Sequence, residues 1–277
     1  MQGYRRAGQT RASPETVAAP LLLPPPIAET VLDAGDGVRV ALSSWTRARS
    51  TAVIVAPGFF RSRISPMLVR LAEHLAARHD VYCFDFRGHG TSSGRYTFGR
   101  HETRDFGAVL DHVHRRGHAR VAVVGFSMGG TVAVRALGGS RRGGVDPGVA
   151  ALVTVSSPTE VFRLRPGLPP RGLLGASWRG ESHRLPRLDS RTLFRPHLGT
   201  LDEVAWISPT PYLVLHHERD WLVPCAMGEA LHRAAREPRR IHVFRTPERL
   251  HADALVRAIP DQLYAVLDPF LAENLAC

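Results

Sequence analysis

The 277-residue sequence contains no lysine, so all 36 of its basic residues are arginine. Set against 25 acidic residues, they give a formal net charge of +11, a basic balance that nucleic-acid-binding proteins also have. The arginines are scattered among the expected elements rather than gathered on one helix or interleaved with aromatic residues. We therefore expect no nucleic-acid partner and interpret the arginine excess as a bias of the whole composition.

Cysteine is also scarce. The chain has only Cys83, Cys225 and Cys277, an odd number without the spacing of metal ligands. This argues against both a disulfide framework and a structural zinc site, and the histidines show no metal-binding spacing either. We expect a protein of the reducing cytoplasm, with no metal and no cofactor.

Long hydrophobic runs are missing as well. The uncharged apolar stretches fall well short of the ~20 residues that a transmembrane helix needs, so we expect no integral membrane association. Arg5, Arg6 and the apolar run 18–23 superficially resemble a signal peptide, but prolines at positions 20 and 24–26 interrupt it. We predict a flexible, proline-rich lead over residues 1–26 and one folded domain over 27–277.

Strands and helices are expected to alternate after residue 27. The expected strands are 27–33, 38–45, 52–56, 81–85, 121–125, 149–155, 212–216 and 241–245. The expected helices are 65–78, 102–115, 128–137, 227–236 and 252–275. The first two strands form a hairpin, and the later alternation is typical of a parallel sheet with helices on both faces. We predict an α/β fold with a mostly parallel, doubly wound sheet of about eight strands.

Residues from about 158 to 202 break this alternation with six prolines and eight arginines. We interpret this segment as a short Arg/Pro-rich cap inserted over the active-site face. Its eight arginines exceed its three acidic residues before position 200 by five charges. The surplus either attracts an anionic ester or membrane surface, or forms a solvated face, which the overall arginine bias favours.

The most informative motif is Gly125-Phe126-Ser127-Met128-Gly129, which directly follows an apolar strand and precedes a helix. A serine on such a sharp strand-to-helix turn takes strained backbone angles and needs very small residues two positions to either side. This is the nucleophile elbow, in which the first amides of the helix point at whatever the hydroxyl attacks. Ser127 is therefore the predicted nucleophile.

A serine nucleophile needs a base to take its proton and an acid to orient that base. Asp220 and His251 each follow a predicted strand, at the edge where parallel sheets place their sites, and they come in the order serine, acid, base. Glu218 is the alternative acid, but an aspartate followed by apolar residues and Val-Pro fits better. His242 lies within a strand, and His216 and His217 lie too close to the acid in sequence, so we predict His251 as the base.

These residues together resemble the α/β-hydrolase-fold serine hydrolases, near the esterase, monoacylglycerol-lipase and serine aminopeptidase S33-like group. Residues 85–92, Asp-Phe-Arg-Gly-His-Gly-Thr-Ser, are similar to a mainly structural loop of that family. Residues 56–60, Ala-Pro-Gly-Phe-Phe, occupy the place of its His-Gly segment. The resemblance covers about residues 27–275 and implies that the backbone amides of Phe59 and Met128 form an oxyanion hole. Pro57 departs from the usual histidine, but the donated group is a backbone amide and does not require that side chain.

The resemblance implies hydrolysis of a carboxylic ester, or a related acyl bond, of a small molecule through a covalent acyl-enzyme. We expect Phe60, Trp178 and Trp221, together with Phe59 and Met128, to line an apolar pocket for the acyl group. Two alternatives remain open: an acyltransferase using the same triad, and a non-catalytic small-ligand sensor of the same fold. The fold alone does not choose among them, because it serves many chemistries.

Overall fold

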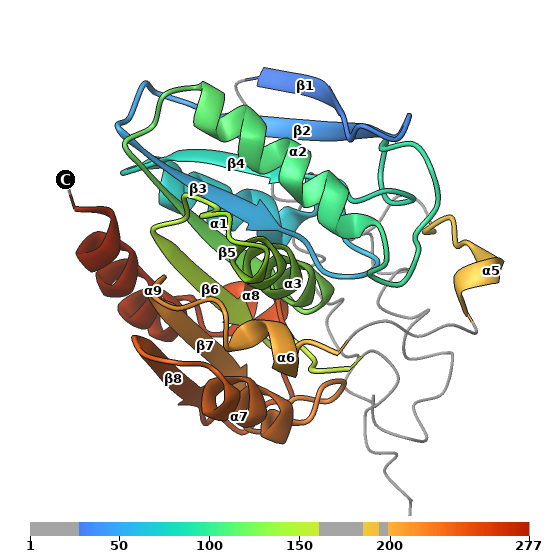
Figure 1. The fold of residues 1–277 in the computed structure, drawn as a ribbon. Helices are drawn as coiled ribbons and strands as arrows, with labels where there is room; N and C mark the ends of the chain where they lie inside the picture. Colours follow the sequence, from blue (N-terminus) through green and yellow to red (C-terminus); the bar gives the residue numbers. More distant parts are fainter. Residues whose placement is uncertain (1–27, 161–184, 194–198, 277) are drawn as a thin grey trace, which may run out of the picture.

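A computed structural model describes residues 28–160, 185–193 and 199–276 (Figure 1). The predicted lead over residues 1–26 lies outside these ranges, as do residues 161–184 and 194–198 of the predicted cap insertion. Within the described ranges, no helix is both long enough and apolar enough to cross a membrane.

One eight-stranded sheet forms the centre of the molecule, in the order β1-β2-β4-β3-β5-β6-β7-β8. Its strands are β1 (Ala28–Asp33), β2 (Arg39–Trp45), β3 (Thr51–Ala56), β4 (Asp80–Phe84), β5 (Arg120–Phe126), β6 (Ala151–Val155), β7 (Tyr212–His217) and β8 (Arg239–Phe244). β3 to β8 are mutually parallel, and β2 pairs antiparallel with both β1 and β4. This arrangement confirms the predicted α/β fold class.

Helices cover both faces of the sheet (Figure 1). One face packs against α1 (Pro66–Ala76), α8 (Ala254–Ala258) and α9 (Pro260–Leu275), and the other against α2 (Glu102–Arg115), α3 (Met128–Arg142), α6 (Leu201–Val204) and α7 (Cys225–Ala234). The fully buried strand β3 serves both cores, because its alternate side chains point to opposite faces. Val53 and Val55 join the first core, whereas Ala52, Ile54 and Ala56 join the second.

The predicted single closing helix over 252–275 is wrong, because the chain breaks it into α8 and α9. Ile259, the residue between them, has φ −137° and ψ 49°, outside the helical region. Pro260 explains the break, since a proline disfavours the α conformation in the residue before it and has no N–H to donate. The same restriction suits Pro260 to the first turn of a new helix, where no donor is needed.

The loop after β4 is held by buried ion pairs. Arg63 donates to Asp85 at 2.7 Å, and Arg87 donates to Asp105 at 2.7 Å and to Asp36 at 2.9 Å. Residues 185–193 of the predicted insertion, which include α5 (Ser190–Leu193), run beside this loop, where residues 96 and 188 form a parallel bridge. The charged side chains of this loop therefore hold the loop in place.

Candidate active site

Ser127 lies at the turn between β5 and α3, with φ 48° and ψ −117°. A non-glycine residue in the left-handed region is strained, and such strain persists only where the surroundings hold it. A Cβ on Gly125 would lie 2.4 Å from the Cα of Gly130, and one on Gly129 would lie 2.2 Å from the carbonyl oxygen of Ala56. Glycine is therefore required at both positions for this turn to pack between its neighbours.

The three predicted triad residues are brought together from distant parts of the chain. His251 Nε2 lies 3.1 Å from Ser127 Oγ, and Nδ1 lies 3.0 and 2.9 Å from the two carboxylate oxygens of Asp220. A carboxylate only accepts hydrogen bonds, so Nδ1–H donates to Asp220 and leaves Nε2 of the neutral ring to accept from the serine hydroxyl. This geometry allows proton transfer from Ser127 to a histidine whose cation Asp220 would stabilise.

Asp220 is completely buried. Burial alone would raise the pKa of its carboxyl, but the charge and hydrogen bond of His251 lower the pKa below its ordinary value of 3.8. The backbone amides of Leu222 and Val223 also donate to Oδ1, both at 2.9 Å. The carboxylate is therefore kept ionised and fixed in direction by its own turn.

The alternative acid and bases lie elsewhere. Glu218 is exposed and pairs with Arg245 at 3.3 Å. His242 lies within β8, where its ring packs edge-on against Phe244. His217 accepts a hydrogen bond from the amide of Arg219 at 3.1 Å. None of these three side chains joins Ser127, whereas His251 does.

His216 is a neighbour of the site that its position in the sequence did not reveal. Its Nε2–H donates to the carbonyl of Val223 at 3.1 Å, and the same nitrogen lies 3.7 Å from Asp220 Oδ2. Burial lowers the pKa of His216, which favours the neutral ring. Among the described residues, its Nδ1 has no hydrogen-bond partner. His216 thus contacts Asp220 and Val223, whereas the ring that contacts Ser127 is that of His251.

A small hollow of about 60 Å³ opens beside Ser127 and His251. Phe59, Phe60 and Trp221 line it, and the Trp221 ring meets the His251 ring edge-on at 5.9 Å. The Met128 side chain does not line it, because it is buried in the core on the α2 and α3 face. Trp178 lies outside the described residues.

The segment predicted to supply the second oxyanion donor passes directly against the serine. A Cβ on Gly58 would lie 3.4 Å from the Cβ of Ser127. The next residue is Phe59, whose ring packs against His89 and Tyr96 at centroid distances of 5.4 and 4.9 Å. The loop that contains Pro57 therefore passes against Ser127, and aromatic packing supports Phe59.

The same hollow contains a buried ion pair that the sequence did not predict. Arg61 Nε donates to Asp253 Oδ2 at 2.7 Å, and both residues line the hollow. They are 192 positions apart, and neither belongs to a motif. The only local signal is that each stands two residues from a predicted site residue, Phe59 or His251.

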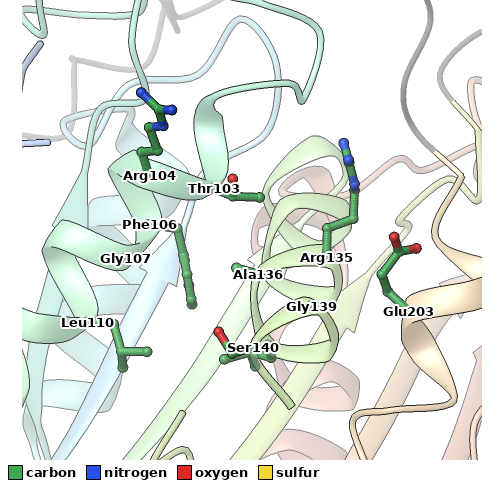
Figure 2. Close-up of a pocket in the computed structure, with 11 residues that line it drawn as sticks. Thr103, Arg104, Phe106, Gly107, Leu110, Arg135, Ala136, Gly139, Ser140 and Glu203 are labelled. Carbon is green, nitrogen blue, oxygen red and sulfur yellow. The ribbon is translucent and has the colours of Figure 1, made fainter. Parts of the chain in front are cut away.

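A larger cavity of about 430 Å³ lies between α2 and α3 (Figure 2), and Ser127 is not among the residues that line it. Phe106 and Leu110 contribute apolar side chains, while Arg104 and Arg135 point upward at its upper end. None of the predicted site residues lines it. As for metals, the described ranges hold no cluster of three His, Cys, Asp or Glu side chains that would bind an ion.

Comparison with known families agrees with this geometry. The model of the alpha/beta hydrolase family matches residues 53–269, which include the elbow, the acid and the base. The chain belongs to the alpha/beta hydrolase family. The matched range contains every strand of the parallel part of the sheet except the start of β3.

Sequence relatives are distant. The chain is 24% identical over 198 residues to YfhR, an uncharacterized protein of Escherichia coli K12, with 69% of this chain and 62% of the relative aligned. The protein of the same name from Escherichia coli O157:H7 is 26% identical over 63% of this chain and 54% of its own length. The chain therefore spans little more than half the length of these relatives.

Solved structures share the fold. The α/β hydrolase GrgF from a Penicillium species has a TM-score of 0.74 at 17% identity, covering 90% of this chain and 99% of its own. The Pyrococcus furiosus esterase Pf2001 has a TM-score of 0.71 at 21% identity, covering 99% and 100%. An esterase from Thermogutta terrifontis has a TM-score of 0.66 at 19% identity, covering 90% and 100%.

Proposed function

We propose that the protein is a serine hydrolase that cleaves a carboxylic ester, or a related acyl bond, through a covalent acyl-enzyme. The observation that carries the proposal is the continuous hydrogen-bonded chain from Ser127 Oγ through His251 to the buried Asp220. A strained serine turn and a hollow at the hydroxyl are what such a chain needs to meet a substrate. The esterases among the structural neighbours are consistent with this chemistry.

In the first half of the reaction, Ser127 Oγ attacks the carbonyl carbon as His251 Nε2 takes its proton. The carbonyl oxygen becomes an oxyanion, which the amides of Phe59 and Met128 stabilise; one such donor is typically worth about 3 kcal/mol. The C–O bond to the alcohol then breaks, and the leaving oxygen takes the proton from Nε2. Asp220 holds the imidazolium through Nδ1–H throughout.

In the second half, a water molecule gives its proton to His251 Nε2 and attacks the acyl carbon. Collapse of the second oxyanion releases the acid, and Ser127 Oγ takes the proton back. The aromatic rings of Phe60 and Trp221 border the hollow and suit an apolar acyl group.

The partner in this proposal is a small acyl ester in a reducing cytoplasm, not a nucleic acid. The arginines support the part of this proposal that concerns nucleic acid, because many of them form ion pairs within the protein. Arg63, Arg87 and Arg240 are each paired with a carboxylate. Among the described residues, arginines held in such pairs are less available to a phosphate backbone.

Hydrolysis of p-nitrophenyl esters from two to sixteen carbons tests the proposal. We expect turnover with an optimum in chain length, and its loss in Ser127→Ala. The matched control is Ser157→Ala, which removes a buried hydroxyl close to the start of α3. Activity that survives Ser127→Ala, or an absence of turnover across the series, would contradict the ester assignment.

A further inference from the structure

Two loops meet at the hollow beside Ser127, and their sequences place corresponding features in the same order. In one, Phe59 is the proposed oxyanion donor, Phe60 has φ 63°, and Arg61 follows. In the other, His251 is the proposed base, Ala252 has φ 50°, and Asp253 follows. Each loop therefore has a strained, non-glycine residue directly after its proposed functional residue and a charged residue directly after that.

The two charged residues meet across the gap. Arg61 Nε donates to Asp253 Oδ2 at 2.7 Å, and the side chains are only 14% and 6% exposed. An ion pair with so little exposure is weakly screened by salt, and removing one partner leaves the other charge buried. Each residue is also held by its own turn: the Arg61 amide donates to the carbonyl of Gly58, and the Val256 amide donates to the carbonyl of Asp253.

Left-handed conformations at phenylalanine and alanine persist only when surrounding contacts fix them. The ion pair joins the two loops at the residues that directly follow the strained positions. Without it, each turn is able to relax toward ordinary backbone angles, and Phe59 or His251 would shift with it. A displacement of about 1 Å at a catalytic group costs on the order of 100-fold in rate.

We propose that the Arg61–Asp253 ion pair is a clasp that fixes the Phe59 amide relative to His251 Nε2. Both are positioning residues, since they act through Phe59 and His251 rather than on the substrate. The inference rests on the proposed function, because the groups being positioned are those of the acyl-transfer reaction.

The test is Asp253→Asn, which keeps the shape of the side chain and removes its charge. We expect a tenfold or greater fall in kcat on a p-nitrophenyl ester and in the rate constant for labelling by a fluorophosphonate, with KM changed less than twofold. The matched control is Glu273→Gln, which disrupts the exposed Arg240–Glu273 pair, joined at 2.6 Å. That variant should stay within twofold of the wild type in every measurement.

Arg61→Gln and the Arg61→Gln/Asp253→Asn double variant complete a double-mutant cycle with Asp253→Asn. A clasp acts as a unit, so the double variant should lose no more than the worse single variant. If Asp253→Asn does not fold, Asp253→Glu keeps the charge, displaces it by one methylene, and should lose part of kcat at an unchanged KM.

Wild-type labelling together with unchanged rates in the folded single variants would overturn the clasp and leave the proposed function standing. A fall confined to KM would also overturn it, because that result assigns the pair to substrate binding. A wild-type protein that neither turns over esters nor labels would overturn the proposed function, and the clasp with it.

Discussion

His216 and Asp220 lie side by side in the interior, with 3.7 Å between His216 Nε2 and Asp220 Oδ2. Both side chains are fully buried. Val223 connects them, because its carbonyl accepts from His216 and its amide donates to Asp220. The ring of His216 therefore supports the turn that carries Asp220 and Val223, and this turn directs the Asp220 carboxylate toward His251.

Replacing His216 by leucine should lower kcat by tenfold or more, because the Val223 carbonyl would lose its donor and the acid turn would loosen. His216→Gln is the matched variant, since its amide nitrogen can still donate to that carbonyl, and it should retain most of the activity. Steady-state kinetics and thermal unfolding of both variants measure the effect. Equal activity in the two would show that the hydrogen bond to Val223 does not matter.

His89 should make stability depend on pH. Burial lowers its pKa to about 4 from an ordinary value of 6.5, and Nδ1–H donates to the carbonyl of Arg87 at 3.1 Å. Between these two pH values the unfolded chain binds a proton that the folded chain refuses, so the free energy of unfolding falls as the pH drops from 6.5 to 4. This single group should contribute a loss of about 3 kcal/mol.

Urea unfolding of the wild type and His89→Asn across this pH range measures that contribution. The asparagine can donate to the same carbonyl but does not titrate, so its stability curve should be flatter. Other buried histidines, including His216 and His79, act in the same direction and will leave a residual slope. Parallel curves for the two proteins would contradict a neutral, buried His89.

Substitution by alanine should change the free energy of unfolding in opposite directions at two glycines. Gly107 lies inside α2 with open space around the added methyl group, on the wall of the cavity in Figure 2, so Gly107→Ala should raise the free energy of unfolding by about 0.5–1 kcal/mol. Gly125→Ala places its methyl 2.4 Å from the backbone of Gly130 and should destabilise the elbow and abolish most activity. Unfolding curves for both variants check the pair. A Gly125→Ala variant with unchanged stability and activity would contradict the packing of the elbow, and a destabilised Gly107→Ala variant would contradict the open space around Gly107.

The sequence allowed the fold class and the succession of strands along the chain to be predicted, and it singled out three residues that the structure brings within hydrogen-bonding distance, because each leaves a local pattern. Apolar runs mark the buried strands, and a glycine, serine and glycine at fixed spacing mark the elbow. The break at Ile259 was missed although Pro260 was visible, because the apolar spacing continues in register through both helices.

Contacts between distant loops left no such pattern. Arg61 and Asp253 stand in separate loops, and periodicity says nothing about which loops will touch. His216 was set aside because it lies only four residues from Asp220. That short separation is what brings the two together, since the chain turns sharply after β7 and folds the acid back over the end of the strand.

The most direct test of the proposed reaction is mass spectrometry of the protein after treatment with a fluorophosphonate. Intact mass reports the number of adducts, and peptide mapping locates them. The proposed chemistry predicts one adduct, on Ser127, that is absent from Ser127→Ala and present in Ser157→Ala. No adduct on the folded wild-type protein, or an adduct on another residue that persists in Ser127→Ala, would contradict the assignment of Ser127 as the nucleophile.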